Sequence, residues 1–362
     1  MKRVGYLYVL NKLLIIFLIW LAREVINPFP PAVFENLHQS VLFDSLIHWD
    51  AGWFLRIAGQ GYDFDSAPFF PLLPFLIRLL TFVTHNGVVS GFLITNTALF
   101  IACFFLYRLV REDCGEEIAV TTVFIMLFFP TAIFFTSIYS ESPLLAFSLG
   151  AFYYARKEKW FTAAILGALA ALTRNLGVVT FLALLYYQYE VNGYRINLKK
   201  ALPLLIIPAS LLIFIAVLWK STGDPLAFAH SLNRDYWGFR HFKYPGAGQL
   251  TNLSLFIYKS EFYSLFESGM AFLFLFLIIR SFKYIKDKSL LIFLVLGFLI
   301  PFSSVVDNLP LGMPRYIIVL FPGYITLAHL LHKNGLVVVY SIISVLVFSV
   351  VSVMFILGRW IS

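Results

Sequence analysis

Three carboxylates, a histidine and two tryptophans lie within eighteen residues of a chain that is otherwise apolar. This stretch runs from His48 to Asp65 and contains Trp49, Asp50, Trp53, Tyr62 and Asp63. Tryptophan and tyrosine at this density are typical of a membrane–water interface, because their rings have one apolar and one polar side. A carboxylate held at such a boundary could act as a general base that takes a proton from a hydroxyl group.

Asp50 is the main candidate for that base, because it lies between two tryptophans just before a helical pattern. The residues alone leave a second interpretation open, in which Asp50 is the N-cap of that helix. Asp63 and Asp65, two positions apart, could bind a hydroxyl-rich ligand or a cation. They could instead form a solvated turn, which the residues alone favour.

Two arginines interrupt apolar runs and could bind an anion. Arg174 breaks a run of nearly thirty residues, and Arg315 begins another in the sequence Met313-Pro314-Arg315-Tyr316. Such an arginine either extends its charge to the interface or binds an anionic group. Two of them on one face suggest recognition of a phosphate, which suits the guanidinium fork.

Other polar segments have two interpretations each. Glu141, in Tyr139-Ser140-Glu141-Ser142-Pro143, either belongs to a helix cap formed by Ser142 or has a function at the membrane surface. Residues 220–260 mix aromatic and basic residues, among them His241. That segment either wraps a lipid phosphate or covers the helices.

The composition predicts an all-α polytopic membrane protein. The chain of 362 residues is 60% hydrophobic and 13% charged, with a mean hydropathy of +0.85. It contains repeated apolar runs of about twenty residues, the length that crosses a bilayer. The net charge of +8 comes mostly from short loops between these runs. This is the pattern of cytoplasmic loops, so we expect a lipid bilayer and no nucleic acid as partner.

The apolar segment 67–83 allows two topologies. If it crosses the membrane, the basic loops at 108–111, 156–159 and 195–200 become external. If it lies along the interface, all of these loops are cytoplasmic, which the positive-inside rule favours. We therefore expect interfacial helices in a first external loop, residues 27–86, after an uncleaved first span.

This choice predicts one transmembrane domain, residues 1–362, with about eleven spans. A second large external segment covers residues 220–260. The expected spans and broken helices are 6–26, 88–110, 118–136, 143–156, 160–188, 201–219, 262–282, 289–306, 314–332 and 335–358. Segment 160–188 is expected to form two short helices that meet at the external face. Eight charged or titratable residues then share the external face and are expected to form a site: Asp50, Asp63, Asp65, Glu141, Arg174, Asp224, His241 and Arg315.

No metal-ligand cluster, P-loop, Rossmann glycine pattern or nucleophile elbow occurs in the sequence. We therefore expect no cofactor and no required metal, and a nucleotide-sugar donor is disfavoured.

At this point the motifs resemble a known family. His48–Ala58, Gly61-Tyr62 and Phe69–Pro74 resemble the first luminal loop of PIG-V-type mannosyltransferases, which add the second mannose to the glycosylphosphatidylinositol (GPI) core, and of their prokaryotic relatives. Tyr139–Ser142 and Thr173–Gly177 resemble further blocks of that family in the same order. Thr222–Pro225 and Pro314–Tyr316 are more loosely similar to elements of lipid-phosphate-sugar transferases of the GT-C fold.

The resemblance implies a GT-C bundle that transfers mannose from polyprenyl or dolichyl phosphate mannose to a hydroxyl of a glycan or glycolipid, with inversion. It implies that Asp50 is the catalytic base, and that Asp63 or Asp65 orients the acceptor. The expected substrate-binding residues are His48, Trp49, Tyr62, Asp63, Asp65, Tyr139, Glu141, Arg174, Asn175, His241, Arg315 and Tyr316.

The expected location is a prokaryotic cell membrane, or the endoplasmic reticulum membrane of a eukaryote, with the site on the non-cytoplasmic face. The chain is shorter than expected of the eukaryotic enzymes, which leaves the acceptor open. Two alternatives remain: a transporter or flippase of lipid-linked sugars, for which the broken segment 160–188 is the only hint, and a GT-C transferase that uses another sugar or a protein or lipid A acceptor.

Overall fold

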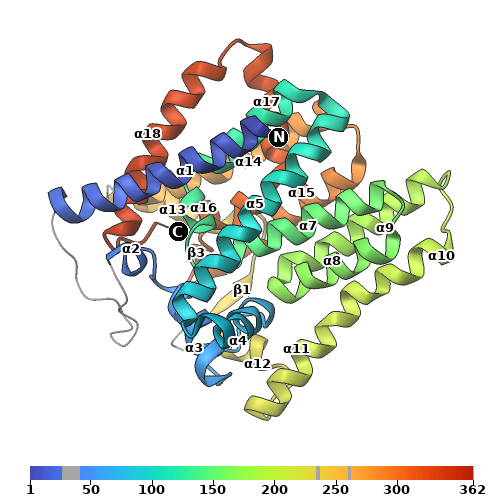
Figure 1. Ribbon diagram of the computed structural model, residues 1–362, viewed down its shortest axis with the longest axis horizontal. Coiled ribbons are helices and arrows are strands. Elements are labelled where there is room, and N and C mark those ends of the chain that lie inside the picture. The colour runs from blue at the N-terminus through green and yellow to red at the C-terminus, as the bar shows by residue number, and fades with distance from the viewer. Residues whose placement is uncertain (27–40, 234–236, 260–261, 362) are drawn as a thin grey trace.

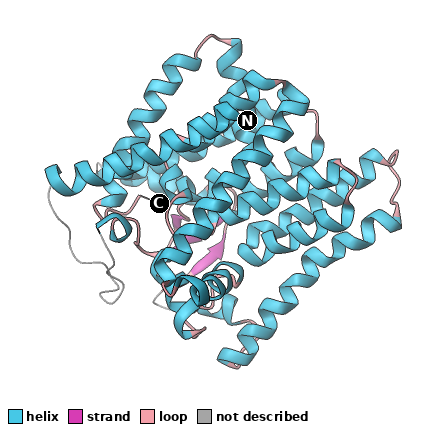
Figure 2. Ribbon diagram, viewed as in Figure 1, coloured by secondary structure: helices cyan, strands magenta, loops and turns pink. Residues whose placement is uncertain are grey.

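The computed structural model describes residues 1–26, 41–233, 237–259 and 262–361 (Figure 1). These residues form a bundle of helices, with one small sheet near its middle (Figure 2). The proline-rich start of the predicted first external loop lies outside the described residues, as does the middle of segment 220–260.

Five described helices are long and apolar enough to cross a membrane. They are Lys2–Val25, which contains α1 (Lys2–Leu21), then α5 (Gly87–Cys114), Leu198–Thr222, which contains α11 (Ile206–Thr222), Tyr263–Tyr284 of α14 (Phe262–Tyr284), and α18 (Val337–Ile356). A sixth would be the pair Met313–Val319 and Phe321–Lys333, which is bent by 83°. The all-helical polytopic class is confirmed, whereas the predicted number of about eleven spans is not.

The other expected spans are short helices. They are α6 (Glu116–Leu127), α7 (Glu141–Arg156), α8 (Trp160–Thr173), α9 (Val179–Val191), α15 (Lys288–Phe302) and α17 (Phe321–Lys333). Each is shorter than the roughly 20 residues that a straight span needs. The expected span 118–136 is interrupted after Leu127, and a separate helical turn follows at Ala132–Phe135.

α7 lies at the centre of the bundle, against α5 and α8. Nearly all of its residues are buried, and the packing is close at Gly150. A Cβ at this position would lie 3.1 Å from both Leu166 and Phe105, which belong to the two neighbouring helices. The central helix is therefore held on both sides, and its first residue, Glu141, has a fixed place.

The prediction of two short helices in segment 160–188 is confirmed. α8 ends at Thr173, Arg174 is extended with φ −165° and ψ 151°, and a single helical turn at Asn175–Val178 leads into α9. The break therefore leaves Arg174 between two helices.

The first loop contributes three helices, α2 (Val41–Asp44), α3 (Asp50–Gln60) and α4 (Leu72–Thr84). Figure 1 shows α3 and α4 together beside one end of α5. The 13 residues of α4 span about 20 Å, less than a bilayer core. One side of α4 is buried at Leu73 and Ile77, and the other exposes apolar side chains such as Phe82. Its length suits the predicted interfacial helix, and its orientation to the bilayer stays a prediction.

The small sheet joins two distant parts of the chain. β1 (Arg240–Phe242) pairs antiparallel with β2 (Ser304–Val306), so that Arg240 lies opposite Val306. β2 in turn pairs with β3 (Leu309–Pro310). Main-chain hydrogen bonds therefore fix segment 220–260 against the loop that precedes Arg315.

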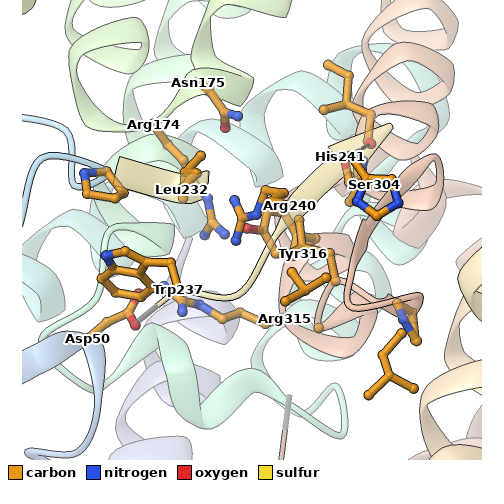
Figure 3. A pocket seen from close by; sticks show the side chains of 18 of the residues that line it. Asp50, Arg174, Asn175, Leu232, Trp237, Arg240, His241, Ser304, Arg315 and Tyr316 are labelled. Carbon is orange, nitrogen blue, oxygen red and sulfur yellow. Dashed lines mark hydrogen bonds and ion pairs between the residues drawn. The ribbon is translucent and has the colours of Figure 1, made fainter. Parts of the chain in front are cut away.

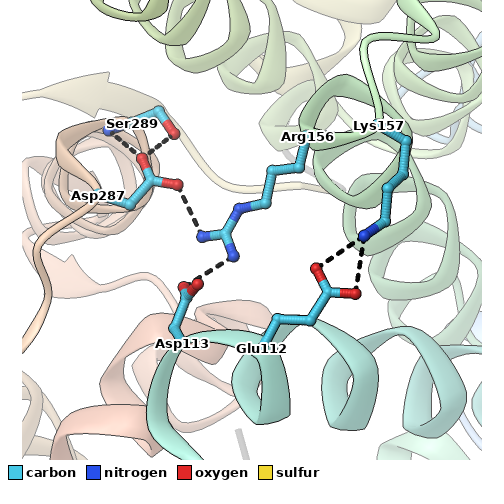
Figure 4. Close-up of polar contacts among 6 residues, drawn as sticks. All are labelled: Glu112, Asp113, Arg156, Lys157, Asp287 and Ser289. Carbon is cyan, nitrogen blue, oxygen red and sulfur yellow. Dashed lines mark hydrogen bonds and ion pairs between the residues drawn. The ribbon is translucent and has the colours of Figure 1, made fainter.

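Ion pairs join three loops at one end of the bundle (Figure 4). Arg156 at the end of α7 contacts Asp113 and Asp287, each at 2.7 Å, and Lys157 contacts Glu112 at 2.9 Å. The sequence predicts a cytoplasmic position for the loop 156–159, and these ion pairs join it to the end of α5 and the start of α15. The three segments therefore lie together.

Candidate active site

Four charged residues from distant segments form one connected cluster. Arg315 Nη2 lies 2.5 Å from Asp50 Oδ2, and its Nε donates to Glu141 Oε1 at 2.6 Å. Arg174 Nη1 donates to the same Glu141 oxygen. The predicted convergence of these residues on one end of the bundle is therefore found in the structure.

Asp50 is the first residue of α3, with Trp49 before it in a left-handed conformation of φ 47°. The alternative in which Asp50 is the N-cap is therefore wrong, and its side chain instead contacts Arg315. The turn is held from both sides. The Trp49 ring packs edge-on against Phe355 and Trp360, and Tyr139 Oη donates to the His48 carbonyl at 3.0 Å.

Glu141 is buried at the first turn of α7. The predicted cap by Ser142 is wrong, because Ser142 Oγ donates to the Phe135 carbonyl at 2.7 Å. Burial by itself would raise the pKa of Glu141, but the guanidinium groups of Arg315 and Arg174 outweigh it and lower that pKa. Glu141 is thus the shared anion that holds the two arginines in place.

The two arginines also lie over aromatic rings. The Arg174 guanidinium is 4.3 Å from the centre of the Tyr316 ring, and that of Arg315 is 4.5 Å from the Tyr139 ring. Such contacts are favourable for a cation and orient its plane. The arginines predicted to bind phosphate are therefore each held by a carboxylate and a ring.

The break that positions Arg174 depends on Gly177. A Cβ at Gly177 would lie 2.0 Å from the carbonyl oxygen of Ala170, which is backbone and cannot move aside easily. The Gly177 amide donates to the Arg174 carbonyl at 2.8 Å, which closes the turn. Only glycine allows this close approach.

A cavity of about 930 Å³ opens beside the cluster (Figure 3). The predicted site residues that line it are Asp50, Arg174, Asn175, His241, Arg315 and Tyr316. Glu141 and Tyr139 are buried and contact Arg315 from behind, while Trp49 packs against Trp360, which lines the cavity. The cavity therefore combines a carboxylate with arginines and apolar rings.

Arg240 also lines this cavity, although the sequence pointed to its neighbour His241. Figure 3 shows the guanidinium groups of Arg174 and Arg240 directed toward the same part of the cavity. Within the described residues, Arg240 has no ion-pair partner, and its buried Nε has no hydrogen bond. His241 is exposed, with its ring nitrogen near the Phe239 carbonyl.

Five predicted residues of the first loop are not part of the described lining of the cavity: His48, Trp49, Tyr62, Asp63 and Asp65. Tyr62 Oη donates to the Phe69 carbonyl at 2.7 Å, and Asp63 pairs with Arg56. The Ser66 amide donates to Asp63 Oδ1 at 2.8 Å. Of the two interpretations of Asp63, the structure therefore supports the turn.

The backbone of Asp65 accepts a hydrogen bond from Trp237 Nε1 at 2.8 Å, which ties the first loop to segment 220–260. Across the described ranges, no group of three or more His, Cys, Asp or Glu side chains is placed to hold a metal ion.

The fold is that of GT-C membrane glycosyltransferases. The oligosaccharyltransferase of Archaeoglobus fulgidus in its apo form superposes with a TM-score of 0.51, covering 97% of this chain and 56% of that one at 12% identity. ArnT from Cupriavidus metallidurans gives the same TM-score over 84% of this chain and 71% of its own, at 13% identity. At such identities the likeness concerns the fold alone.

The sequence defines the family. Residues 8–218 match the family described as mannosyltransferase (PIG-V), and the chain belongs to that family. This confirms the resemblance inferred from the first-loop motifs. The matched region contains Asp50, Glu141 and Arg174, whereas Arg240 and Arg315 lie beyond it.

Two curated relatives are GPI mannosyltransferases. GPI mannosyltransferase 2 of Schizosaccharomyces pombe is 31% identical over 165 residues, which is 44% of this chain and 35% of that protein. GPI mannosyltransferase pigv-1 of Caenorhabditis elegans is 32% identical over 165 residues, 38% of this chain and 25% of its own length. The similarity thus spans about a third or less of these relatives.

Proposed function

We propose that the chain transfers mannose from a polyprenyl phosphate to a hydroxyl group of a glycan or glycolipid. Membership of the PIG-V mannosyltransferase family and the GT-C fold support this proposal. The observation that carries it is that Asp50 lines the same cavity as Arg174, Arg240 and Arg315. One cavity then holds a base for the acceptor and cations for the departing phosphate.

In this proposal Asp50 is the general base. Because Arg315 contacts Oδ2, Asp50 Oδ1 is the oxygen that would take the proton of the acceptor hydroxyl. The hydroxyl oxygen forms a bond to C1 of mannose as the bond from C1 to the phosphate oxygen breaks, and the electron pair leaves with the phosphate. Attack from the side opposite the phosphate inverts the configuration at C1.

The arginines would stabilise the charge that develops on the phosphate. Arg240 is free of an acidic partner among the described residues, and Arg174 is oriented by Glu141 and Tyr316. A phosphate is a good leaving group, so no strong general acid is required. Asp50 would accept the proton and the arginines would stabilise the departing phosphate, without a metal ion or cofactor.

We place the site on the non-cytoplasmic face. Glu141 and Arg156 mark the two ends of α7, whose 16 residues span about 24 Å. The basic loops around Arg156 would face the cytoplasm by the positive-inside rule, so the cavity would open on the other side. The proposed location is a prokaryotic cell membrane, or the endoplasmic reticulum in a eukaryote.

The decisive experiment compares Asp50→Asn with the unchanged protein in membranes supplied with radiolabelled polyprenyl phosphate mannose. We expect at least a hundredfold loss of mannose transfer to lipid or glycan, since a general base contributes about that factor or more. Asp65→Asn is the matched control, because it removes an acid of the same loop outside the described lining of the cavity.

Undiminished transfer by Asp50→Asn would overturn the assignment of the base. If the unchanged protein transfers no mannose but moves the lipid-linked sugar from one leaflet of a vesicle membrane to the other, it is a transporter instead.

A further inference from the structure

A second group of polar side chains lines the same cavity, from α13 (Ala247–Lys259) and α14. Asn252, Tyr263 and Glu267 all face this space. Asn252 Nδ2 donates to Glu267 Oε2 at 2.8 Å, and the Met313 amide donates to Glu267 Oε1 at 3.0 Å. Asn252 and Glu267 are buried among the helices, so their polar groups are shielded from bulk solvent.

A purely structural role accounts for only part of this group. The two hydrogen bonds of Glu267 do tie α13 and α16 (Met313–Tyr316) to α14. They leave Tyr263 unexplained, because its buried hydroxyl has no hydrogen-bond partner among the described residues although Tyr263 lines the cavity. A buried polar group without a partner costs free energy, and such groups commonly mark a missing ligand or water.

A neighbouring side chain strengthens this point. Gln249, one turn before Asn252, is 1% exposed, and its Oε1 also has no partner within the described residues. These two polar atoms belong to α13 and α14, and of the two residues only Tyr263 is part of the described lining of the cavity. This group offers hydrogen bonds in both directions, since a carboxyl and an amide oxygen accept and a phenol both donates and accepts.

The charge of this end of the cavity differs from that of the arginine end. In the described part of the chain, Glu267 has no arginine or lysine within ion-pair distance, whereas Figure 3 shows Arg174 and Arg240 directed toward a shared part of the cavity. A ligand that fits both ends carries a phosphate at one end and neutral hydroxyl groups at the other. The two ends are close, because Glu267 binds the first residue of α16 and Arg315 is the third.

We infer that Asn252, Tyr263 and Glu267 form a saccharide subsite that binds the hydroxyl groups of a sugar ring beside the phosphate site. This inference rests on the proposed function and deepens it. The sugar is either the mannosyl unit of the donor or a residue of the acceptor glycan. The hydrogen-bonding chemistry is the same for both.

The test measures binding to the full-length protein in nanodiscs, with three probes: polyprenyl phosphate, polyprenyl phosphate mannose and methyl α-mannoside. Tyr263→Phe is the main variant, because it removes a hydroxyl that has no partner in the described part of the structure. Glu267→Gln is the second, with nearly the same shape. Tyr258→Phe, at an exposed position of α13, is the matched control.

We expect both variants to leave the affinity for polyprenyl phosphate unchanged and to weaken binding of a sugar-bearing probe about three- to tenfold. Weaker binding of polyprenyl phosphate mannose assigns the subsite to the donor sugar. Weaker binding of methyl α-mannoside alone assigns it to the acceptor.

Unchanged binding of all three probes would overturn the inference, as would equal weakening of the two polyprenyl phosphates. These measurements read binding, whereas the Asp50→Asn experiment reads transfer, so either result can fail without the other.

Discussion

Arg315 Nη2 lies 2.5 Å from Asp50 Oδ2, which joins the first residue of α3 to α16. The same guanidinium group donates from Nε to the buried Glu141. The proposed base and the buried acid are therefore coupled through one side chain. A change at Arg315 will act on both.

Arg315→Lys is expected to lower mannose transfer by about a hundredfold and to reduce thermal stability. Lysine keeps the charge but lacks the fork that contacts Asp50 and Glu141 at once. Transfer assays in membranes and thermal unfolding in detergent measure the two effects. Arg359→Lys, at an exposed position, is the control. Full activity of Arg315→Lys would show that the double contact is dispensable.

Arg240→Gln is expected to weaken binding of polyprenyl phosphate by about tenfold or more, since a hydrogen bond to a charged group is worth about 1.5–3 kcal/mol. Its neighbour provides the matched control. His241→Gln changes an exposed side chain of the same strand that also lines the cavity. It should lower the affinity less than Arg240→Gln does, because the His241 ring lies against the Phe239 carbonyl. A larger loss for His241→Gln than for Arg240→Gln would reverse the assignment made from the structure.

Gly177→Ala is expected to destabilise the protein by about 1–3 kcal/mol, as overpacking of a close contact does. The added Cβ would meet the Ala170 carbonyl oxygen at 2.0 Å, so the break must shift and carry Arg174 with it. We expect transfer to fall more than stability alone explains, measured at a temperature where the variant is folded. Gly269→Ala, which has open space around it, should be close to neutral.

Acid is expected to destabilise the protein through His48. Burial lowers the pKa of His48 from 6.5 to about 4. Between these values the unfolded chain binds more protons than the folded one, so stability rises with pH from about 4 to 6.5 and is lost on acidification. The contribution is of the order of 3 kcal/mol. His48→Gln should reduce the dependence of the thermal unfolding temperature on pH between about 4 and 6.5. An unchanged dependence on pH would exclude His48 as the cause.

The sequence predicted the charged cluster only in part. It grouped Asp63 and Asp224 with Asp50, whereas the structure pairs Asp63 with Arg56 and Asp224 with His230. Loop charge placed Asp50, Glu141, Arg174 and Arg315 at one end of the helices, and the cluster is found there. The prediction of the four clustered residues succeeded because charged side chains are costly inside a bilayer. They therefore lie near the ends of the helices, and the charge of the loops indicates which end. The break at Arg174 was predictable because this charged residue interrupts an apolar run of nearly thirty residues.

The sequence did not predict which side chains pair with one another inside the site. Arg174 and Arg315 suggested phosphate ligands, yet both are bound to Glu141, and the less conspicuous Arg240 has no acidic partner among the described residues. Arg240 owes its position to a strand of three residues, too short for an alternating pattern to reveal. Glu267 was missed because it lies within an apolar helix, and only the fold shows that it faces the cavity.

The ladder between β1 and β2 makes the position of Arg240 independent of most side chains around it. Arg240 is held opposite Val306 by main-chain hydrogen bonds, which most residue types can provide. Segments on either side of β1 could therefore be exchanged while the guanidinium group stays at the cavity. The arrangement is modular: the proposed phosphate site keeps its frame when the surface loops around it, and with them the acceptor, are replaced.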